Sequence, residues 1–313
     1  MTRYFVVGGA GFIGSHLVER LVERGPVTVF DNLSVGRRDF IAKPLSQGCE
    51  LVVGDTLDLP ALEAAMRGHD VVFHLAANPE ARWGLENPRL DLEQGTIATW
   101  NVLEAMRRCG ARHLVFSSSG TVYGDTAKVC AEGDLGELPI SLYGASKFAG
   151  EGLIGAFVEC FALSAHVYRF GNVVGPRGTH GAALDFLRKL KWSGRELEVL
   201  GDGSQAKPYV WVEDCVDGML FGLDHARERL NVFNIAPADT TSVRRIAELC
   251  VQASPFPDAS IRYTGGERGW PGDVPKSRLD PQKLAALGWS VRHSSDRAVE
   301  RAVTALAREV FGG

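Results

Sequence analysis

The sequence predicts an α/β fold in which helices cover both faces of a doubly wound parallel sheet, followed by a smaller C-terminal lobe. Short β-branched runs alternate with longer amphipathic stretches through the first half of the 313-residue chain, which is typical of such a sheet. A glycine-rich turn directly follows the first run. After residue 175 the segments become glycine-rich and polar, which indicates a looser second lobe.

The apolar, β-branched runs predict strands at residues 4–7, 27–30, 50–53, 71–75, 113–117 and 165–170. The amphipathic stretches between them predict helices at residues 15–23, 59–66, 96–108 and 146–161. In the second lobe we expect helices at residues 182–192 and 242–253, and residues 211–223 are apolar enough to return to the large domain. The prolines and glycines of residues 265–275 predict a long functional loop.

The composition is that of an ordinary soluble protein, with 45% hydrophobic and 23% charged residues. The formal net charge of -4 provides no overall positive field for nucleic acid or an anionic membrane. The N-terminal apolar run is broken by glycines, and no stretch approaches the roughly 20 apolar residues of a membrane helix. We therefore expect a soluble, unprocessed, cytoplasmic protein without a nucleic-acid or membrane partner.

The six cysteines are scattered, without a C-x-x-C pair and without a histidine at metal-ligand spacing. We therefore expect no metal site. The favoured interpretation is buried or incidental thiols in a reducing compartment, and the alternative is a redox pair between distant cysteines.

Residues 8–14, GGAGFIG, follow the first expected strand and open the first expected helix. Glycines at positions 8, 11 and 14 permit a tight turn and a close approach of the backbone to a pyrophosphate. The helix N-terminus presents free N–H groups and a favourable dipole to that anion. A glycine-rich turn also occurs at ordinary strand-to-helix connections, but in this context it predicts a Rossmann-type dinucleotide site.

Two acidic residues end the next strands. Asp31 lies about twenty residues after the glycines, where a carboxylate accepts hydrogen bonds from the adenosine ribose. Its charge would repel a 2′-phosphate, so NAD is favoured over NADP. Asp55 follows the third strand and has two interpretations, an acceptor for the adenine amino group or a cap of the next helix.

Tyr143 and Lys147 form a Y-x-x-x-K pattern at the start of a long expected helix. A spacing of four places the phenol and the ammonium on one helix face, so Lys147 is expected to lower the pKa of Tyr143 and make it a general base. The alternative is an exposed helix pair. Upstream, the run FSSSGTVYG at residues 116–124 places serine hydroxyls at the carboxyl end of a strand, where they either relay a proton or are solvated turn residues.

The order of these motifs resembles that of the extended short-chain dehydrogenases. The motifs are GGAGFIGSHL, FDNLSVG, VFHLAA, FSSSGTVYG, YGASK, RFGNVVGP, LGDGSQAKPYVWVEDCVDGM and GERGWPGDVP. The whole chain is similar to their nucleotide-sugar epimerase branch, the NAD-dependent epimerase/dehydratase family. The resemblance implies bound NAD, a UDP-sugar substrate of the UDP-glucose/UDP-galactose type, and a homodimer formed through residues 96–108 and 146–161.

The resemblance also implies a role for each part of the chain. Residues 1–174 would form the NAD-binding Rossmann domain with a returning segment near 209–236, and residues 175–313 mainly the substrate-binding α/β lobe. The implied catalytic residues are Ser119, Tyr143 and Lys147. The implied cofactor-binding residues are Gly8, Gly11, Phe12, Ile13, Gly14, Asp31, Asn32, Ser34, Gly36, Asp55, Thr56, Leu75, Ala76, Ala77, Ser117, Tyr143 and Lys147. The implied substrate-binding residues are Ser119, Asn172, Lys207, Arg268 and Asp273.

The implied reaction is a 4-epimerisation. Tyr143 removes the proton of the C4 hydroxyl, hydride passes to NAD, and the 4-keto sugar takes hydride back on its other face. Dehydratases and decarboxylases of the superfamily usually carry an acidic residue soon after the catalytic hydroxyl, whereas no carboxylate follows Ser119 until Asp125. A dehydratase, decarboxylase or reductase is the alternative enzyme. A non-enzymatic NAD-binding protein is disfavoured because Ser119, Tyr143 and Lys147 are all present.

Several positions depart from the family pattern. Lys207 stands where a phosphate-binding arginine is usual and lacks the bidentate fork, and Arg268 lies two residues earlier than the common spacing. Gly95 replaces a frequent asparagine, and Asn78 follows the HLAA-like motif where a lysine is frequent. Ser277 replaces a bulky aromatic residue of some epimerases, so it either admits an N-acetylhexosamine or is an ordinary loop residue.

Overall fold

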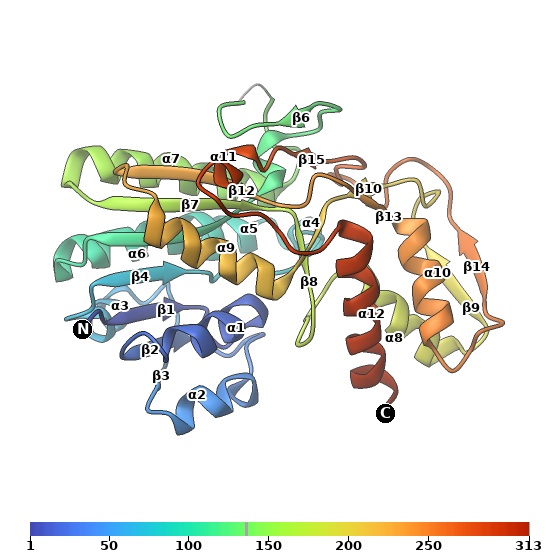
Figure 1. Ribbon diagram of the computed structural model, residues 1–313, viewed down its shortest axis with the longest axis horizontal. Helices are drawn as coiled ribbons and strands as arrows, with labels where there is room; N and C mark the ends of the chain where they lie inside the picture. Colours follow the sequence, from blue (N-terminus) through green and yellow to red (C-terminus); the bar gives the residue numbers. More distant parts are fainter. Residues whose placement is uncertain (135–136, 313) are drawn as a thin grey trace. The chain divides into compact units, whose positions relative to one another are not determined.

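A seven-stranded sheet forms the centre of the N-terminal part of the chain and confirms the α/β, doubly wound fold class (Figure 1). The computed structural model describes residues 1–134 and 137–312. The strand order is β12-β7-β5-β4-β1-β2-β3. These strands are β1 (Tyr4–Val7), β2 (Val27–Asp31), β3 (Glu50–Val53), β4 (Val71–His74), β5 (His113–Ser119), β7 (Ser164–Phe170) and β12 (Leu230–Ile235).

The register aligns the carboxyl ends of the central strands. Val7 of β1 is level with Phe30 of β2 on one side and with His74 of β4 on the other, and both pairings are parallel. His74 in turn is level with Phe116 of β5. The residues that follow these strands therefore meet at one edge of the sheet, which is where ligands bind in open α/β sheets.

Helices cover both faces of this sheet. The helical segments of the N-terminal half are α1 (Phe12–Leu21), η1 (Arg38–Ile41), α2 (Ala42–Ser46), α3 (Leu59–Met66), α4 (Trp83–Glu86), α5 (Arg89–Asp91), the π-helix η2 (Leu92–Ile97), α6 (Ala98–Cys109), η3 (Gly120–Tyr123) and α7 (Leu142–Phe161). Helices α3, α6 and α7 lie on one face and α1 on the other (Figure 1).

Strand alternation explains the core between the sheet and its helices. Alternate side chains of a strand point to the same face, and Phe5, Val72 and Leu114 pack with Met66 of α3 and Ile154 of α7 in one buried cluster. Burial of such side chains contributes roughly 1.5–3 kcal/mol each. The sheet and α7 therefore form a firm support for side chains at the strand ends.

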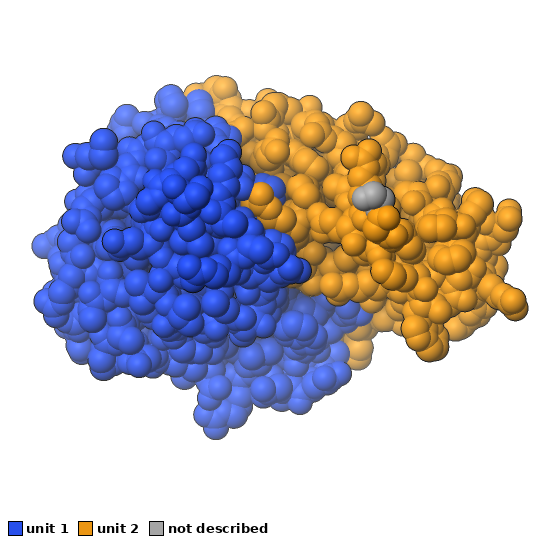
Figure 2. Space-filling model, turned by 90° about the horizontal axis from the view of Figure 1, so that it is seen from below, with its two compact units in different colours: residues 1–122, 142–169, 219–233 blue, residues 123–141, 170–218, 234–313 orange. Residues whose placement is uncertain are grey.

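The chain divides into two compact units, coloured separately in Figure 2. Unit 1 comprises residues 1–122, 142–169 and 219–233, and unit 2 comprises residues 123–141, 170–218 and 234–313. The remaining segments are β6 (Val129–Cys130), β8 (Asn172–Val174), α8 (Ala182–Ser193), β9 (Glu196–Val199), β10 (Ala206–Lys207), β11 (Tyr209–Trp211), α9 (Val212–His225), β13 (Thr241–Ser242), α10 (Val243–Ala253), β14 (Ser260–Tyr263), β15 (Arg278–Leu279), α11 (Gln282–Ala285) and α12 (Ser295–Phe311).

Some expected elements differ from those observed. Helix α7 begins at Leu142, four residues before the expected start, and the π-helix η2 overlaps the start of the expected helix 96–108, so that α6 begins at Ala98. Strand β12 and the 17-residue helix α12 were not expected. Across residues 1–134 and 137–312, no helix is long and apolar enough to cross a membrane.

Candidate active site

The glycine turn after β1 is shaped by two different constraints. Gly8 has a φ of 80°, and a Cβ there would lie 2.6 Å from the Ala76 nitrogen, while a Cβ at Gly14 would collide with the Gly8 carbonyl oxygen. Gly11 has no such crowding, because its nearest neighbour would be 3.4 Å away. It is the N-cap of α1, and no side chain caps that end. The open space at Gly11 and the uncapped helix end fit a bound pyrophosphate.

Asp31 is fixed beside this turn at the end of β2. Its carboxylate is buried and accepts hydrogen bonds from the backbone nitrogens of Ala10 at 3.0 Å and Leu33 at 2.8 Å. Burial raises the pKa of Asp31, and the two backbone hydrogen bonds oppose that rise. A Cβ at Gly36 would lie 2.8 Å from one carboxylate oxygen. Glycine at position 36 is therefore required by Asp31.

Other predicted cofactor residues are linked to one another by hydrogen bonds. Asn32 donates to Asp55 at 3.0 Å and accepts from the backbone nitrogen of Ser34 at the same distance. The helix-cap interpretation of Asp55 is wrong, because α3 is capped by Asp58, whose side chain accepts from the Ala61 nitrogen. Asp55 instead accepts from the Leu57 nitrogen in the turn before that helix.

The remaining predicted cofactor residues lie near the ends of the neighbouring strands or at the start of α1. The backbone nitrogens of Leu75 and Ala76 both donate to the Val7 carbonyl, at 2.9 and 3.1 Å. Thr56 is buried, and its carbonyl accepts from Asn101 at 2.8 Å. The structure thus brings the first three strand ends and β4 together around the glycine turn. The other members of the set are Phe12, Ile13, Ala77 and Ser117.

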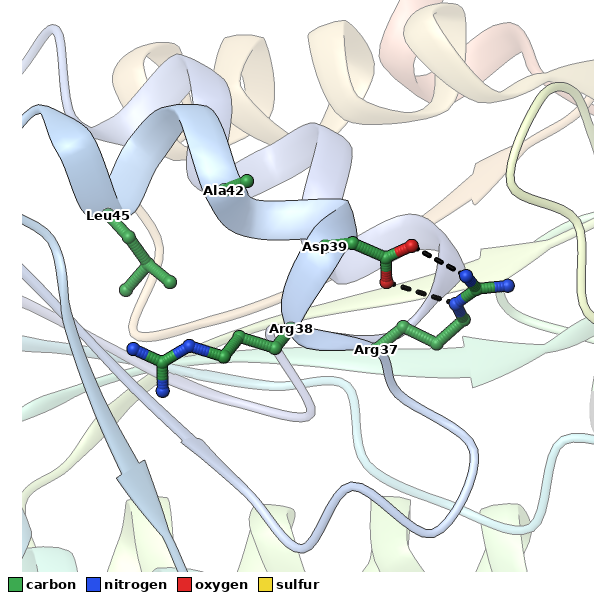
Figure 3. A pocket seen from close by; sticks show the side chains of 5 residues that line it. All are labelled: Arg37, Arg38, Asp39, Ala42 and Leu45. Carbon is green, nitrogen blue, oxygen red and sulfur yellow. Dashed lines mark hydrogen bonds and ion pairs between the residues drawn. The ribbon is translucent and has the colours of Figure 1, made fainter.

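A surface pocket lies beyond these residues on η1 and α2 (Figure 3). Arg37 donates to the Asp39 carboxylate with two nitrogens, at 3.0 and 2.6 Å. Both side chains are well exposed. None of the predicted site residues lines this pocket. Its lining residues are Arg37, Arg38, Asp39, Ala42 and Leu45.

The predicted catalytic residues meet where β5 ends beside α7. A hydrogen bond joins the Ser119 hydroxyl to the Tyr143 phenol. The Lys147 ammonium donates to the Ser117 carbonyl oxygen at 2.7 Å and lies 5.8 Å from the centre of the Tyr143 ring. Ser119 also accepts from the Thr121 hydroxyl at 3.0 Å. Lys147 is therefore buried and Tyr143 half-buried, so the two do not form an exposed helix pair.

The prediction that the pKa of Tyr143 is lowered is wrong for the protein without a bound ligand. Burial raises the pKa of Tyr143 to about 12, the charge of Asp91 raises it further, and the Ser119 hydrogen bond opposes the rise. Burial likewise lowers the pKa of Lys147 to about 8, against the charges of Asp91 and Glu151. Removal from water disfavours the charged form of each side chain. For Tyr143 this effect outweighs the effect of the nearby Lys147 charge, on which the prediction is based.

Polar side chains that the sequence did not indicate surround this pair. His74 is fully buried, with a pKa lowered to about 3 by burial, and faces the Thr99 hydroxyl at 3.1 Å. Asp91 accepts from Asn78 at 3.1 Å, and its other oxygen is buried without a partner among the described residues. Burial raises the pKa of Asp91. The only sequence signal for Glu151 is its position four residues after Lys147.

The four predicted substrate residues outside β5 also come together, all within unit 2. Lys207 forms an ion pair with Asp273 at 2.6 Å, and Arg268 donates to the Asp273 carbonyl at 2.7 Å. Arg268 also pairs with Asp125. The backbone nitrogen of Asn172 donates to the Pro208 carbonyl at 2.8 Å, beside Lys207. Two cations thus lie close to Asn172 and Asp273, and each of them is paired with a carboxylate.

Known proteins share both the sequence and the fold. A sequence model described as the NAD dependent epimerase/dehydratase family matches residues 4–236. UDP-glucose 4-epimerase of Mycolicibacterium smegmatis is 33% identical over 92% of this chain and 93% of its own length. UDP-N-acetyl-alpha-D-glucosaminuronate decarboxylase of Bacillus cytotoxicus is 30% identical over 91% of each chain.

Solved structures give the same relationship. A UDP-galactose 4-epimerase superposes with a TM-score of 0.88 at 38% identity and covers 98% of this chain and 99% of its own. A UDP-glucose 4-epimerase of Thermus thermophilus in complex with NAD has a TM-score of 0.85 at 29% identity, covering 97% and 99%.

The sheet, the glycine turn and the tyrosine–lysine pair of α7 together define a dinucleotide-dependent enzyme of the Rossmann class. The chain belongs to the NAD-dependent epimerase/dehydratase family. The predictions of the family and of NAD as its cofactor are confirmed.

Proposed function

We propose that this chain is a UDP-sugar 4-epimerase that acts on sugars of the UDP-glucose/UDP-galactose type. The observation that carries the proposal is the contact of the half-buried Tyr143 and Ser119, beside the buried Lys147, at the carboxyl end of the sheet. Such a hydroxyl and phenol pair is suited to moving one proton to and from a sugar hydroxyl. The relatives that cover more than nine-tenths of the chain support the same substrate class.

The cofactor residues would hold NAD across the carboxyl ends of the first strands. The space beside Gly11 and the uncapped end of α1 suit its pyrophosphate, and the Asp31 carboxylate suits the adenosine ribose. Asn32, Ser34 and Asp55 form the outer wall on the adenine side. When bound, NAD supplies a positively charged ring that takes up and returns the hydrogen at C4 of the sugar.

The acid–base work falls to Tyr143. The Ser119 hydroxyl is bonded to the phenol, so it can pass a proton between the phenol and the sugar oxygen. The positive charge of Lys147 stabilises the phenolate, which burial alone disfavours. One group therefore removes the proton of the C4 hydroxyl and returns it, as a reaction without net change of redox state requires.

The substrate diphosphate is assigned to Lys207 and Arg268, Asn172 is assigned to the diphosphate or the sugar, and Asp273 is a further substrate-binding residue. Lys207 brings a charge without the fork of an arginine, and its pairing with Asp273 at 2.6 Å holds the ammonium in place. Ser277 is small and half-buried, which supports a pocket that also admits an N-acetylhexosamine. Residues 1–174, with the return near 209–236, are proposed as the NAD-binding domain and residues 175–313 as the substrate lobe.

A decarboxylase or dehydratase is the second candidate, because a decarboxylase is among the relatives. Those reactions need a further acid or base near the catalytic hydroxyl. Asp125 is the first carboxylate after Ser119, and it is paired with Arg268. This pairing favours plain epimerisation.

We place the enzyme in the cytoplasm, because all six cysteines are free thiols. We also propose a homodimer through the surface of η2, α6 and α7. Ile97, Trp100 and Phe161 are each about two-fifths exposed there, and apolar side chains of this size favour a partner surface.

The test is turnover without added cofactor. Purified protein is incubated with UDP-glucose, UDP-galactose, UDP-N-acetylglucosamine and UDP-glucuronic acid, and the sugar protons are followed by NMR. Interconversion of a C4 pair at constant total sugar is expected. A 4-keto-6-deoxy sugar or released CO₂ would replace the proposal by the second candidate, and no conversion of any sugar would refute both.

A further inference from the structure

The middle serine of β5 has no role in the proposed reaction, although it is almost fully buried. Ser118 is 2% exposed, and its hydroxyl donates to a carboxylate oxygen of Glu151 at 2.5 Å. Glu151 lies on α7, eight residues after Tyr143 and four after Lys147. A buried carboxylate needs such donors, because an isolated charge in the interior is costly.

Glu151 has a second, charged partner. Arg169 of β7 is 2% exposed and donates to both carboxylate oxygens of Glu151, with Nε at 3.0 Å from one and Nη2 at 2.6 Å from the other. Two-point pairing of this kind fixes orientation as well as charge. Ser118, Glu151 and Arg169 thus join β5, α7 and β7, and all three belong to unit 1.

The contacts of β5 with α7 form a continuous series. Tyr143, Lys147 and Glu151 are spaced by four residues and lie on one helix face. They bind three consecutive residues of β5, which are Ser119, Ser117 through its carbonyl oxygen, and Ser118. The two catalytic contacts therefore share one strand and one helix with the Glu151 contact.

We propose that Glu151 is a positioning residue of the 4-epimerase: with Ser118 and Arg169 it holds β5 against α7 so that Ser119 and Lys147 remain in place around Tyr143. The inference rests on the proposed function. Glu151 also contributes negative charge beside Lys147. The titratable and charged groups packed around Lys147 come from β4, α5, α7 and β7, and are His74, Asp91, Tyr143, Glu151 and Arg169.

The charge has a consequence that can be measured. Burial lowers the pKa of Lys147 to about 8, and the carboxylates of Asp91 and Glu151 oppose that lowering. Loss of the Glu151 charge removes one of these two opposing carboxylates, so Lys147 loses its proton at a lower pH. His74 stays neutral through this range, since its pKa is about 3. In a variant without the Glu151 charge, the decline of the rate at alkaline pH should therefore begin at a lower pH than in the wild type.

The experiment compares Glu151→Gln with the matched control Glu159→Gln in the protein with the NAD it retains on purification. Glu159 is on the same helix, is mostly exposed and lies 3.7 Å from Arg229. We expect Glu151→Gln to lower kcat roughly tenfold to a hundredfold at a KM within about twofold. The alkaline decline of kcat should begin about one pH unit earlier. Glu159→Gln should leave all three quantities unchanged.

Two further measurements keep the proposal open to refutation. Ser118→Ala leaves the Glu151–Arg169 pair intact, so it should fold normally and still lower kcat at unchanged KM. NMR titration of the Lys147 side chain with ¹³C at Cε, assigned by Lys147→Ala, needs no substrate. We expect a midpoint near pH 8 in the wild type and a lower one in Glu151→Gln.

If no UDP-sugar is turned over, the proposed function fails, while the lysine titration still decides the role of Glu151. The proposal would be overturned if the Lys147 titration midpoint is unchanged in Glu151→Gln and kcat is normal in Ser118→Ala. So would a fall in kcat of Glu151→Gln that only matches its loss of folded protein.

Discussion

Gly95 passes so close to Ser146 that a Cβ at position 95 would lie 2.6 Å from the serine Cβ. The contact joins the π-helix η2 to the catalytic helix α7, directly before Lys147. Ser146 also donates to the Tyr143 carbonyl at 2.8 Å. The glycine that replaces the usual asparagine is therefore explained by packing.

Gly95→Ala should lower the free energy of unfolding by about 1–3 kcal/mol, because the added methyl group overpacks a buried contact. Chemical denaturation measures this loss. Combining it with Ser146→Gly, which removes the opposing Cβ, should recover part of the stability beyond the sum of the two single changes. If the two changes in the free energy of unfolding simply add, the contact with Ser146 does not limit the size of the side chain at position 95.

Asp31→Asn should reduce the NAD retained on purification about tenfold or more. The carboxylate accepts from the Ala10 and Leu33 nitrogens, and an amide would turn a donor toward one of them. Bound nucleotide is released and quantified against protein. The matched control is Asp39→Asn, which should retain NAD normally. Asp39 is an exposed carboxylate that forms an ion pair with Arg37 (Figure 3). Equal retention in both variants would remove Asp31 from the cofactor site.

Lys207→Met should raise the KM for the UDP-sugar about tenfold and leave kcat within about threefold, since a lost phosphate contact weakens binding rather than chemistry. Steady-state kinetics measure both. Lys276 is exposed on a neighbouring segment, and Lys276→Met is the control that should change neither. A fall in kcat at constant KM would instead place Lys207 near the reacting atoms.

Acidification should destabilise the fold through buried histidines. The pKa of His166 is lowered from 6.5 to about 4, mainly by burial, and its ring nitrogen lies 2.9 Å from one of His113. Below pH 6.5 the unfolded chain takes up a proton that the folded chain refuses, so stability is complete above 6.5 and is lost from there toward pH 4. The loss should reach a few kcal/mol at most.

Urea denaturation at pH 7 and pH 5 measures this loss. His166→Phe removes the titrating group and keeps a ring, so it should reduce the difference between the two pH values. His225→Gln, at an exposed position, should leave the difference unchanged. A pH dependence that persists in full in His166→Phe would assign the effect to other groups, such as His74.

Local patterns predicted the parts of the fold that depend on local chemistry. Strands β1 and β3 match their predicted bounds, because a short apolar, β-branched run between turn residues favours a strand. The start of α7 was placed too late, because Tyr143 and Gly144 are weak helix formers that tertiary packing overrides. Helix α12 was missed although Ser294 caps it by accepting from the Arg297 nitrogen, a signal that the sequence carried.

The candidate site likewise contains residues that local spacing predicts and residues that depend on distant partners. The glycine turn and Asp31 follow from spacing along one chain segment. Asp91 and Glu151 could not be assigned, because their roles depend on burial and on partners as distant in sequence as Ser118 is from Glu151. The same burial reversed the expected pKa of Tyr143. Desolvation is a property of the folded chain, and spacing does not report it.

The most direct test of a 4-epimerase that uses Tyr143 is turnover of UDP-glucose deuterated at C4 without added cofactor. We predict UDP-galactose that keeps the deuterium at C4, because the hydrogen taken from C4 is returned to the same carbon, and no conversion by Tyr143→Phe. Deuterium that appears at C6 or in the solvent, or conversion that persists in Tyr143→Phe, would contradict a 4-epimerase that uses Tyr143.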